Sequence, residues 1–135
     1  MFPTYKAILI IRSLFYFQIM NIETARIYED KETSDNIRIL VDRLWPRGIS
    51  KKEAHLDYWH KQWAPSDDLR RKFHDNKISW DEFSKNYKSE LKENKNQILN
   101  DLEEVDKRKS LTLLYGSKDK THNHAVLLKD FLKDL

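Results

Sequence analysis

The stretch "IRILVDRLWPRGIS", residues 37–50, decides the fold because it joins a strand pattern to a loop that is dense in functional groups. Its first part, Ile37–Asp42, is a β-branched run typical of a buried strand. The part from Val41 to Ser50 holds a carboxylate, two arginines, a tryptophan, a proline and one of only two glycines in the chain. Such a set of residues suits either a ligand-binding turn or a structural turn that is held in place by its own hydrogen bonds and ion pairs.

Two further segments have the pattern of strands, "IETARIY" after Met20 and "SLTLLYG" at Ser110–Gly116. We expect the 37–42 and 110–115 strands to pair in parallel, since about 67 residues separate them and leave room for a right-handed crossover. Strands with intervening helices predict an α/β fold, with a small, mostly parallel sheet flanked by helices in a single compact domain.

Serine caps and apolar spacing predict the remaining elements. Ser50 with Glu53, and Ser79 with Glu82, form S-x-x-E capping boxes. The expected segments are a polar turn at Lys31–Asn36, a helix from Ser50 to Pro65 with Leu56, Trp59 and Trp63 on its apolar side, a short helix from Ser66 to about Phe73, a stripe from Trp80 to Val105 that thins at Glu93–Asn96, and a last helix capped by Thr121.

Residues 1–19 differ in composition from the rest of the chain. The run "AILIIRSLFYFQIM" is apolar over 14 positions with one arginine inside, which is shorter than the roughly 20 residues of a membrane span. We therefore expect no membrane span, and we interpret 1–19 as a non-core extension before a domain of residues 20–135. A peripheral anchor or a masked N-terminal element is the alternative.

Composition excludes several classes of site. The chain has no cysteine, which removes disulfides, thiolate zinc sites and cysteine nucleophiles. Two glycines 68 positions apart cannot form a glycine-rich phosphate loop. The net charge is +3, but without Lys6 and Arg12 the remaining chain has 23 basic and 22 acidic residues. This near-neutral balance gives only weak support to a nucleic-acid partner.

Parallel pairing would bring "DRLWPRG" and "YGSKDKTHNH" to the same edge of the sheet, where open α/β sheets bind ligands. Arginine forks suit phosphate or carboxylate, a tryptophan face suits a ring, and a helix N-terminus attracts anions. The expected ligand-binding residues are Arg43, Trp45, Arg47, Gly48, Lys118 and Asn123. In the structural alternative, Asp42 and Asp119 pair with Arg43 and Arg47 and lock the two loops together.

The triplet "HNH" raises the question of a metal site. On one helix His122 and His124 would point about 200° apart, so we expect no shared metal ion. The position of His124 on the apolar stripe indicates a core histidine. His122 beside Asp119 is the candidate catalytic pair for proton transfer.

Four segments in this order and spacing resemble the YeaO-like family, domain of unknown function 488: "VDRLWPRGISKKEAHLDYW", "WAPSDDLRRKF", "WDEFSKNYKSEL" and "LTLLYGSKDKTHNHAVLL". The resemblance covers Ile22–Leu132 and implies an uncharacterised cytoplasmic protein with no cofactor. Some members of this family are labelled transcriptional regulators. The motif positions present here are Asp42, Arg43, Trp45, Pro46, Arg47, Gly48, Pro65, Ser66, Lys118, Asp119, His122, Asn123 and His124.

These observations favour a protein that binds or acts on a small anionic, phosphorylated or nucleotide-like ligand, and they leave open whether it is an enzyme. One alternative is a nucleic-acid-binding or regulatory protein, which must explain the missing helix-turn-helix signature. The other is a module for a protein partner, with the tryptophan loop as the binding hot spot.

Overall fold

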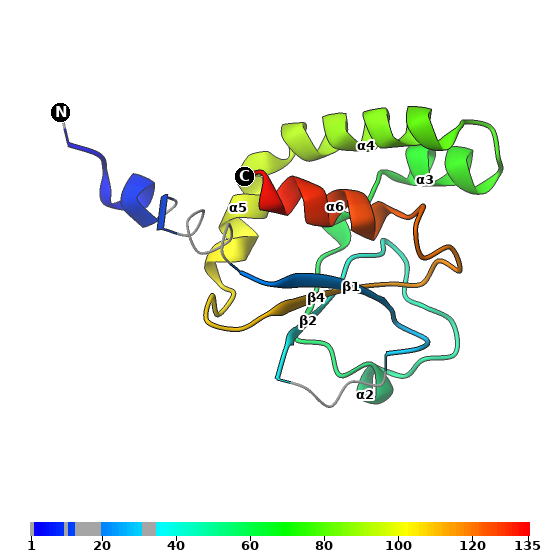
Figure 1. Cartoon of the computed structure of the whole chain (residues 1–135), viewed down its shortest axis with the longest axis horizontal. Helices are drawn as coiled ribbons and strands as arrows, with labels where there is room; N and C mark the ends of the chain where they lie inside the picture. Colours follow the sequence, from blue (N-terminus) through cyan, green and yellow to red (C-terminus); the bar gives the residue numbers. More distant parts are fainter. Residues whose placement is uncertain (1, 10, 13–19, 31–34) are drawn as a thin grey trace.

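Strands β2 (Ile37–Leu40) and β4 (Leu111–Tyr115) lie side by side in a four-stranded sheet, shown in Figure 1. The structure is a computed structural model that describes residues 2–9, 11–12, 20–30 and 35–135. The strand order is β1-β4-β2-β3, with β1 at Ile22–Arg26 and β3 at Tyr58–Trp59, and every pair is parallel. The predicted parallel pairing of the 37–42 and 110–115 strands is confirmed, and with it the α/β fold class.

The helices lie mainly on one side of this sheet. They are α2 (Lys51–Ala54), the 3-10 helix η1 (Lys61–Trp63), α3 (Asp67–His74), α4 (Trp80–Glu93), α5 (Lys95–Glu103) and α6 (His124–Lys133). In Figure 1, α3, α4 and α6 lie above the sheet and α2 lies below it. The predicted interruption of the long stripe is confirmed, since α4 ends and α5 begins on either side of Asn94.

Both faces of the sheet are covered, which explains why every residue of the central strands β2 and β4 is buried. On β2, Ile37 and Ile39 belong to the larger core with α4, α5 and α6, whereas Leu40 belongs to a smaller core on the other face. The indole rings of Trp45 and Trp59 pack against this smaller core. The loop after β2 is therefore part of the fold's second hydrophobic layer.

The helix expected from Ser50 to Pro65 is wrong. The Ser50–Glu53 capping box is present, but α2 lasts only four residues because His55 takes a left-handed conformation with φ of 48° and ends it. The chain then adds β3 to the edge of the sheet beside β2. The helical spacing of the two tryptophans in this segment is a coincidence that pairing with β2 overrides.

The cap of the last helix is also not the one expected. Asn123 is the N-cap of α6, and its side-chain oxygen accepts a 3.1 Å hydrogen bond from the Val126 N–H. Thr121 lies earlier, in a turn around Asp119, and donates to that carboxylate through its backbone and its hydroxyl. Helix α6 therefore begins at His124, and His122 precedes it.

A buried charge in β2 attaches α2 to the sheet. Arg38 is 4% exposed, and its Nη1 lies 3.0 Å from Asp30 Oδ1. Its Nε and Nη2 donate to the carbonyl of Ala54 at 3.2 and 3.0 Å. This arginine is a fold-forming residue that the strand pattern did not single out.

Met20 is buried, and its carbonyl accepts a 2.9 Å hydrogen bond from Lys133 Nζ. Before it, Phe2, Tyr5 and Ile11 are exposed. Residues 31–34 of the predicted polar turn, and residues 1, 10 and 13–19 of the extension, lie outside the described residues. Within the described ranges, no helix is both long and apolar enough to cross a membrane.

Candidate functional site

The segments that follow β2 and β4 leave the same edge of the sheet, as the sequence predicted. We call residues 41–50 and 116–123, together with the strand ends that carry them, the carboxyl edge. Val41 N–H donates to the Leu114 carbonyl at 3.0 Å, so the two strands stay paired up to the start of the loops. The structure thus brings together the two segments that hold the predicted site residues. Some of their side chains bond to the protein's own backbone, and others are exposed to solvent.

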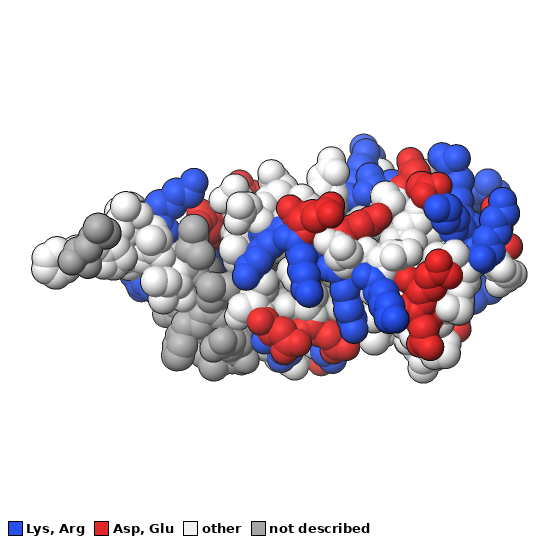
Figure 2. Space-filling model, turned by 90° about the horizontal axis from the view of Figure 1, so that it is seen from above, with Lys and Arg blue, Asp and Glu red and all other residues white. Residues whose placement is uncertain are grey.

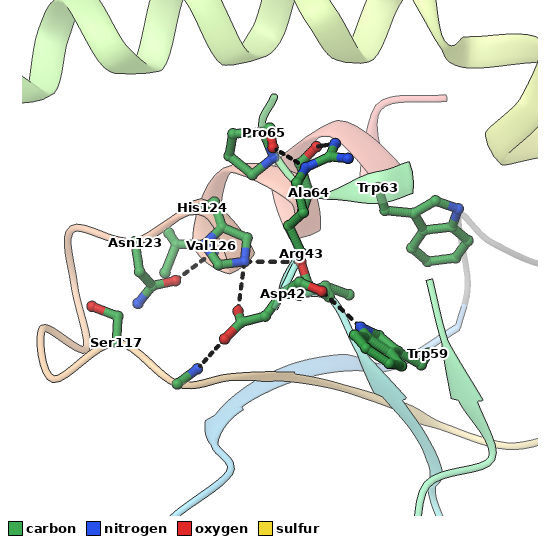
Figure 3. A network of polar contacts seen from close by, with 12 residues as sticks. Asp42, Arg43, Trp59, Trp63, Ala64, Pro65, Ser117, Asn123, His124 and Val126 are labelled. Atoms are coloured by element: carbon green, nitrogen blue, oxygen red, sulfur yellow. Dashed lines mark hydrogen bonds and ion pairs between the residues drawn. The ribbon is translucent and has the colours of Figure 1, made fainter. Parts of the chain in front are cut away.

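Asp42 joins three elements at the carboxyl edge (Figure 3). Its Oδ2 accepts a 2.9 Å hydrogen bond from the Gly116 N–H, and its own carbonyl accepts one of 2.8 Å from Trp59 Nε1. A Cβ on Gly116 would lie 3.0 Å from Asp42 Oδ2, so a larger residue there would crowd this contact. The second glycine of the chain is thus explained by close approach to a carboxylate.

His124 completes this junction from the first turn of α6. Its Nε2 lies 3.0 Å from the Val41 carbonyl and 3.0 Å from Asp42 Oδ1. The hydrogen bond is directed at the carbonyl, and the carboxylate oxygen lies off the direction of the N–H, making an electrostatic contact. Because both neighbours are acceptors, Nε2 carries a proton. The predicted core histidine is satisfied by this hydrogen bond, but it is only partly buried, with a side chain that is 16% exposed, and it lies outside both hydrophobic cores.

Arg43 turns away from the carboxyl edge and binds backbone. Its Nε donates to the Pro65 carbonyl at 2.8 Å and its Nη2 to the Ala64 carbonyl at 3.2 Å (Figure 3). The alternative in which Asp42 and Asp119 pair with the two arginines of the loop is therefore wrong in its partners. The two loops are held together, but by the hydrogen bond between Asp42 and Gly116, and Arg43 instead bonds to backbone carbonyl groups.

Trp45 is also engaged within the protein. Its indole N–H donates to the Ile49 carbonyl at 2.7 Å, and its ring meets the ring of Trp59 edge-on, with centroids 5.2 Å apart. Gly48 has a φ of 79°, a left-handed conformation that favours glycine and turns the chain back toward Ile49. Trp45 therefore forms part of the second core and does not stand out as a free stacking surface.

Arg47 projects from the same loop and is exposed, with no hydrogen-bond or ion-pair partner for its side chain in the described part of the chain. Its carbonyl accepts a 2.9 Å hydrogen bond from the Tyr28 hydroxyl. The Tyr28 ring lies 3.7 Å from the position of a Cβ on Gly116, and the Arg26 guanidinium lies 4.7 Å from the ring centre. Tyr28 thus bridges the two loops of the carboxyl edge.

The loop after β4 is folded around Asp119. Its Oδ1 accepts from the backbone N–H of His122 at 2.9 Å and of Thr121 at 3.0 Å, and its carbonyl accepts from Asn123 Nδ2 at 2.9 Å. These hydrogen bonds, that of His122 first, lower the pKa of the Asp119 carboxyl. Asp119 therefore stays ionised at neutral pH and holds the turn, which makes it a weak proton acceptor. Lys118, beside it, is exposed and has no partner among the described residues.

His122 is exposed and stacks on a neighbouring helix. Its ring lies 4.9 Å from the Trp80 ring, and its Nδ1 lies 3.9 Å from Asp119 Oδ2. The predicted pair of Asp119 and His122 is adjacent, at a separation longer than a hydrogen bond. In the described ranges, no group of three or more His, Cys, Asp or Glu side chains could hold a metal ion.

Sequence reasoning missed Arg26 and Tyr28, which lie at the end of β1. Arg26 Nε donates to the Ser117 carbonyl at 3.0 Å, so β1 supplies a third side to the carboxyl edge. Beside it, an open depression of about 520 Å³ includes Arg26 and Lys120 in its lining. Glu29 pairs with Lys120 at 2.7 Å and lies 3.8 Å from Arg26. The sequence signal for these two residues was an arginine at the end of the first strand and a tyrosine two positions after it.

Comparisons with known proteins identify a family for this chain. The family model described as the inactive DUF488-N3 subclade matches residues 21–135. The uncharacterized protein YeaO of Escherichia coli is 44% identical over 116 residues, which is 86% of this chain and 100% of the relative. The uncharacterized proteins Mb3100c of Mycobacterium bovis and Rv3073c of Mycobacterium tuberculosis are each 34% identical over 111 residues, which is 82% of this chain and 92% of each relative. No solved structure matches the chain significantly. The chain therefore belongs to the YeaO-like DUF488 family, within the subclade that is described as inactive.

Proposed function

We propose that this protein binds a small phosphorylated or nucleotide-like compound at the carboxyl edge of the sheet, and that it binds this compound without converting it. One observation supports this proposal most strongly. Arg47 and Lys118 are exposed cations without partners among the described residues, on two loops that Tyr28 and Asp42 hold together. These cations give up no existing ion pair when they meet an anion, and the ordering of their exposed side chains is the cost of binding.

The surroundings of these cations suit a ring that carries an anionic group. The exposed Tyr28 ring lies beside the Arg26 guanidinium and between the two loops. An arginine fork can bind phosphate through two hydrogen bonds, and an aromatic face can stack on a base. The depression lined by Arg26 and Lys120, and also by Glu29 and Asp30, has a volume in the usual range of ligand sites, about 300–1,000 Å³; Tyr28, Arg47 and Lys118 are not in its lining.

Two observations favour binding over catalysis. The Asp119 carboxylate is occupied by backbone N–H groups, which lower its pKa and weaken it as a base. The matching subclade is itself described as inactive. We accordingly propose that Asp119 and His122 hold the shape of the loop beside the ligand and transfer no proton. Asn123 caps α6 and fixes the end of this loop.

The test is a panel of inorganic phosphate, pyrophosphate, sugar phosphates and mononucleotides, scored by thermal shift and then by calorimetry. At a concentration of 100 times Kd, a ligand should stabilise the fold by about 2.7 kcal/mol. Arg47→Ala and Lys118→Ala should each weaken binding on the order of 10-fold or more, since each removes a charge-assisted contact. Lys85→Ala, an exposed lysine on α4, is the matched control.

The proposal fails if no compound gives saturable stabilisation, or if Arg47→Ala and Lys118→Ala bind as the wild type does. Retention of DNA or RNA that weakens steeply with salt, together with no response to the small compounds, would instead favour the nucleic-acid alternative.

A further inference from the structure

A second surface lies away from the carboxyl edge, in a groove of about 530 Å³ between α4 and α6, here called the α4–α6 groove. Lys88, Lys92 and Lys95 line it on the side of α4 and the start of α5. Asp130 and Asp134 line it on the side of α6. Figure 2 shows the face above α4 and α6, where basic and acidic side chains lie next to one another. The two walls of the groove thus carry opposite charges.

The charged groups of these walls have no ion-pair partners among the residues that the structure describes. None of the three lysines and neither aspartate forms an ion pair with another residue of the described ranges. The fourth lysine of the groove, Lys133, is different, because its Nζ donates to the Met20 carbonyl. Its Nζ is therefore held at the Met20 carbonyl, and it adds one positive charge to the α6 side, which the two aspartates outnumber.

Between the walls the groove has an apolar floor. Phe131 and Leu135 are partly exposed, and Leu127, beside them, belongs to the main core. The aliphatic stems of the wall lysines extend this apolar surface. An apolar centre with a charged rim is the usual anatomy of a protein–protein interface.

We propose that the α4–α6 groove is the interface of a symmetric dimer, and that its occupant is a second copy of this chain. A two-fold axis that runs along the groove places the lysine wall of one copy opposite the aspartate wall of its partner, twice over. At the same time it turns the two apolar floors toward each other across the space that the two copies enclose. A groove with one basic and one acidic wall is therefore complementary to itself, whereas a wholly basic groove would call for an acidic partner of another kind.

The first test is the mass of the full chain in solution by sedimentation velocity, at low and high protein concentration and at low and high salt. We expect a monomer–dimer equilibrium that shifts toward monomer as salt rises, because salt screens exposed ion pairs. Lys88→Glu, Lys92→Glu and Lys95→Glu combined, or Asp130→Lys with Asp134→Lys, should each weaken the dimer on the order of 100-fold, since like charges then face each other.

The full swap of both walls separates this interface from general charge effects. It should dimerise again with itself, because its acidic wall faces a basic wall, and it should fail to form mixed dimers with the wild type. Lys77→Glu with Lys85→Glu, which lies outside the groove, is the control and should leave dimerisation unchanged. Circular dichroism checks that every variant is folded. A wild type that is monomeric at all concentrations, or a dimer that tolerates either wall reversal, would overturn the proposal.

Discussion

Replacing Asp42 tests whether the conspicuous loop after β2 serves mainly to hold the fold together. Alanine at this position removes the acceptor of the Gly116 N–H and the carboxylate that faces His124 Nε2. Asparagine keeps the shape but offers one acceptor and one donor. With its oxygen toward Gly116, its amide nitrogen would face Nε2–H of His124, which remains a donor because the Val41 carbonyl accepts from it.

The size of the effect follows from these contacts. A hydrogen bond to a charged group contributes about 1.5–3 kcal/mol to stability, and a buried N–H without an acceptor costs about as much. The Asp42 side chain is only 19% exposed, so solvent screening is limited. We expect Asp42→Ala to lose about 2–4 kcal/mol and Asp42→Asn about 1–2 kcal/mol. At roughly 4 °C per kcal/mol, the alanine variant should melt about 8–16 °C lower.

Urea denaturation followed by tryptophan fluorescence and circular dichroism measures this loss. Asp68→Asn is the matched control, because Asp68 is 78% exposed and pairs with the exposed Lys72, and it should stay within about 0.5 kcal/mol of the wild type. If Asp42→Ala stays equally close to the wild type, the junction around Asp42 does not hold the carboxyl edge together. The conclusion that the contacts of Asp42 with Gly116 and His124 hold the two loops in place would then also be wrong.

Three further outcomes are expected. Arg38→Met should lose about 3–5 kcal/mol in urea denaturation because it removes the buried guanidinium that pairs with Asp30 and bonds to the Ala54 carbonyl, and a loss below about 1 kcal/mol would contradict this. Burial, opposed by Asp101, lowers the pKa of His60 below its usual value of 6.5, so the unfolded chain takes up the proton first. The free energy of unfolding should therefore fall as pH drops below about 6.5, and His60→Phe should flatten this dependence; an unchanged slope would refute it. Removal of residues 1–19 should leave one cooperative melt with an unchanged midpoint, and an insoluble or molten product would assign this segment to the core.

Sequence patterns predicted those parts of the fold that local chemistry decides. The runs at 37–42 and 110–115 are rich in Ile, Leu and Val, which indicates buried strands, and their separation leaves room for the crossover that parallel pairing needs. The thinning at Glu93–Asn96 correctly marked a helix break. The segment 51–63 was mispredicted because its structure depends on hydrogen bonds to β2 and on the left-handed turn at His55, neither of which has a periodic signature.

For the candidate site, the sequence located the edge but not the contacts. Topology alone places Asp42 near Gly116, since each follows one of two neighbouring parallel strands. The direction of Arg43 could not be predicted, because its acceptors are carbonyls of Ala64 and Pro65, whose position depends on the packing of η1. Tyr28 was missed because an aromatic residue after an edge strand has no motif of its own.

The density of functional groups in residues 41–50 now has a physical explanation. Asp42, Arg43 and Trp45 each direct their strongest polar group at a neighbouring backbone group, so they fix the positions of the loops. Substituting any of them would lower stability, and a loss of ligand binding measured on such a variant would carry no information about contact with the ligand. Arg47 and Lys118 differ because they hold nothing in place within the described chain. A binding defect at these two positions with an unchanged melting temperature is therefore the measurement that separates a ligand site from a structural corner.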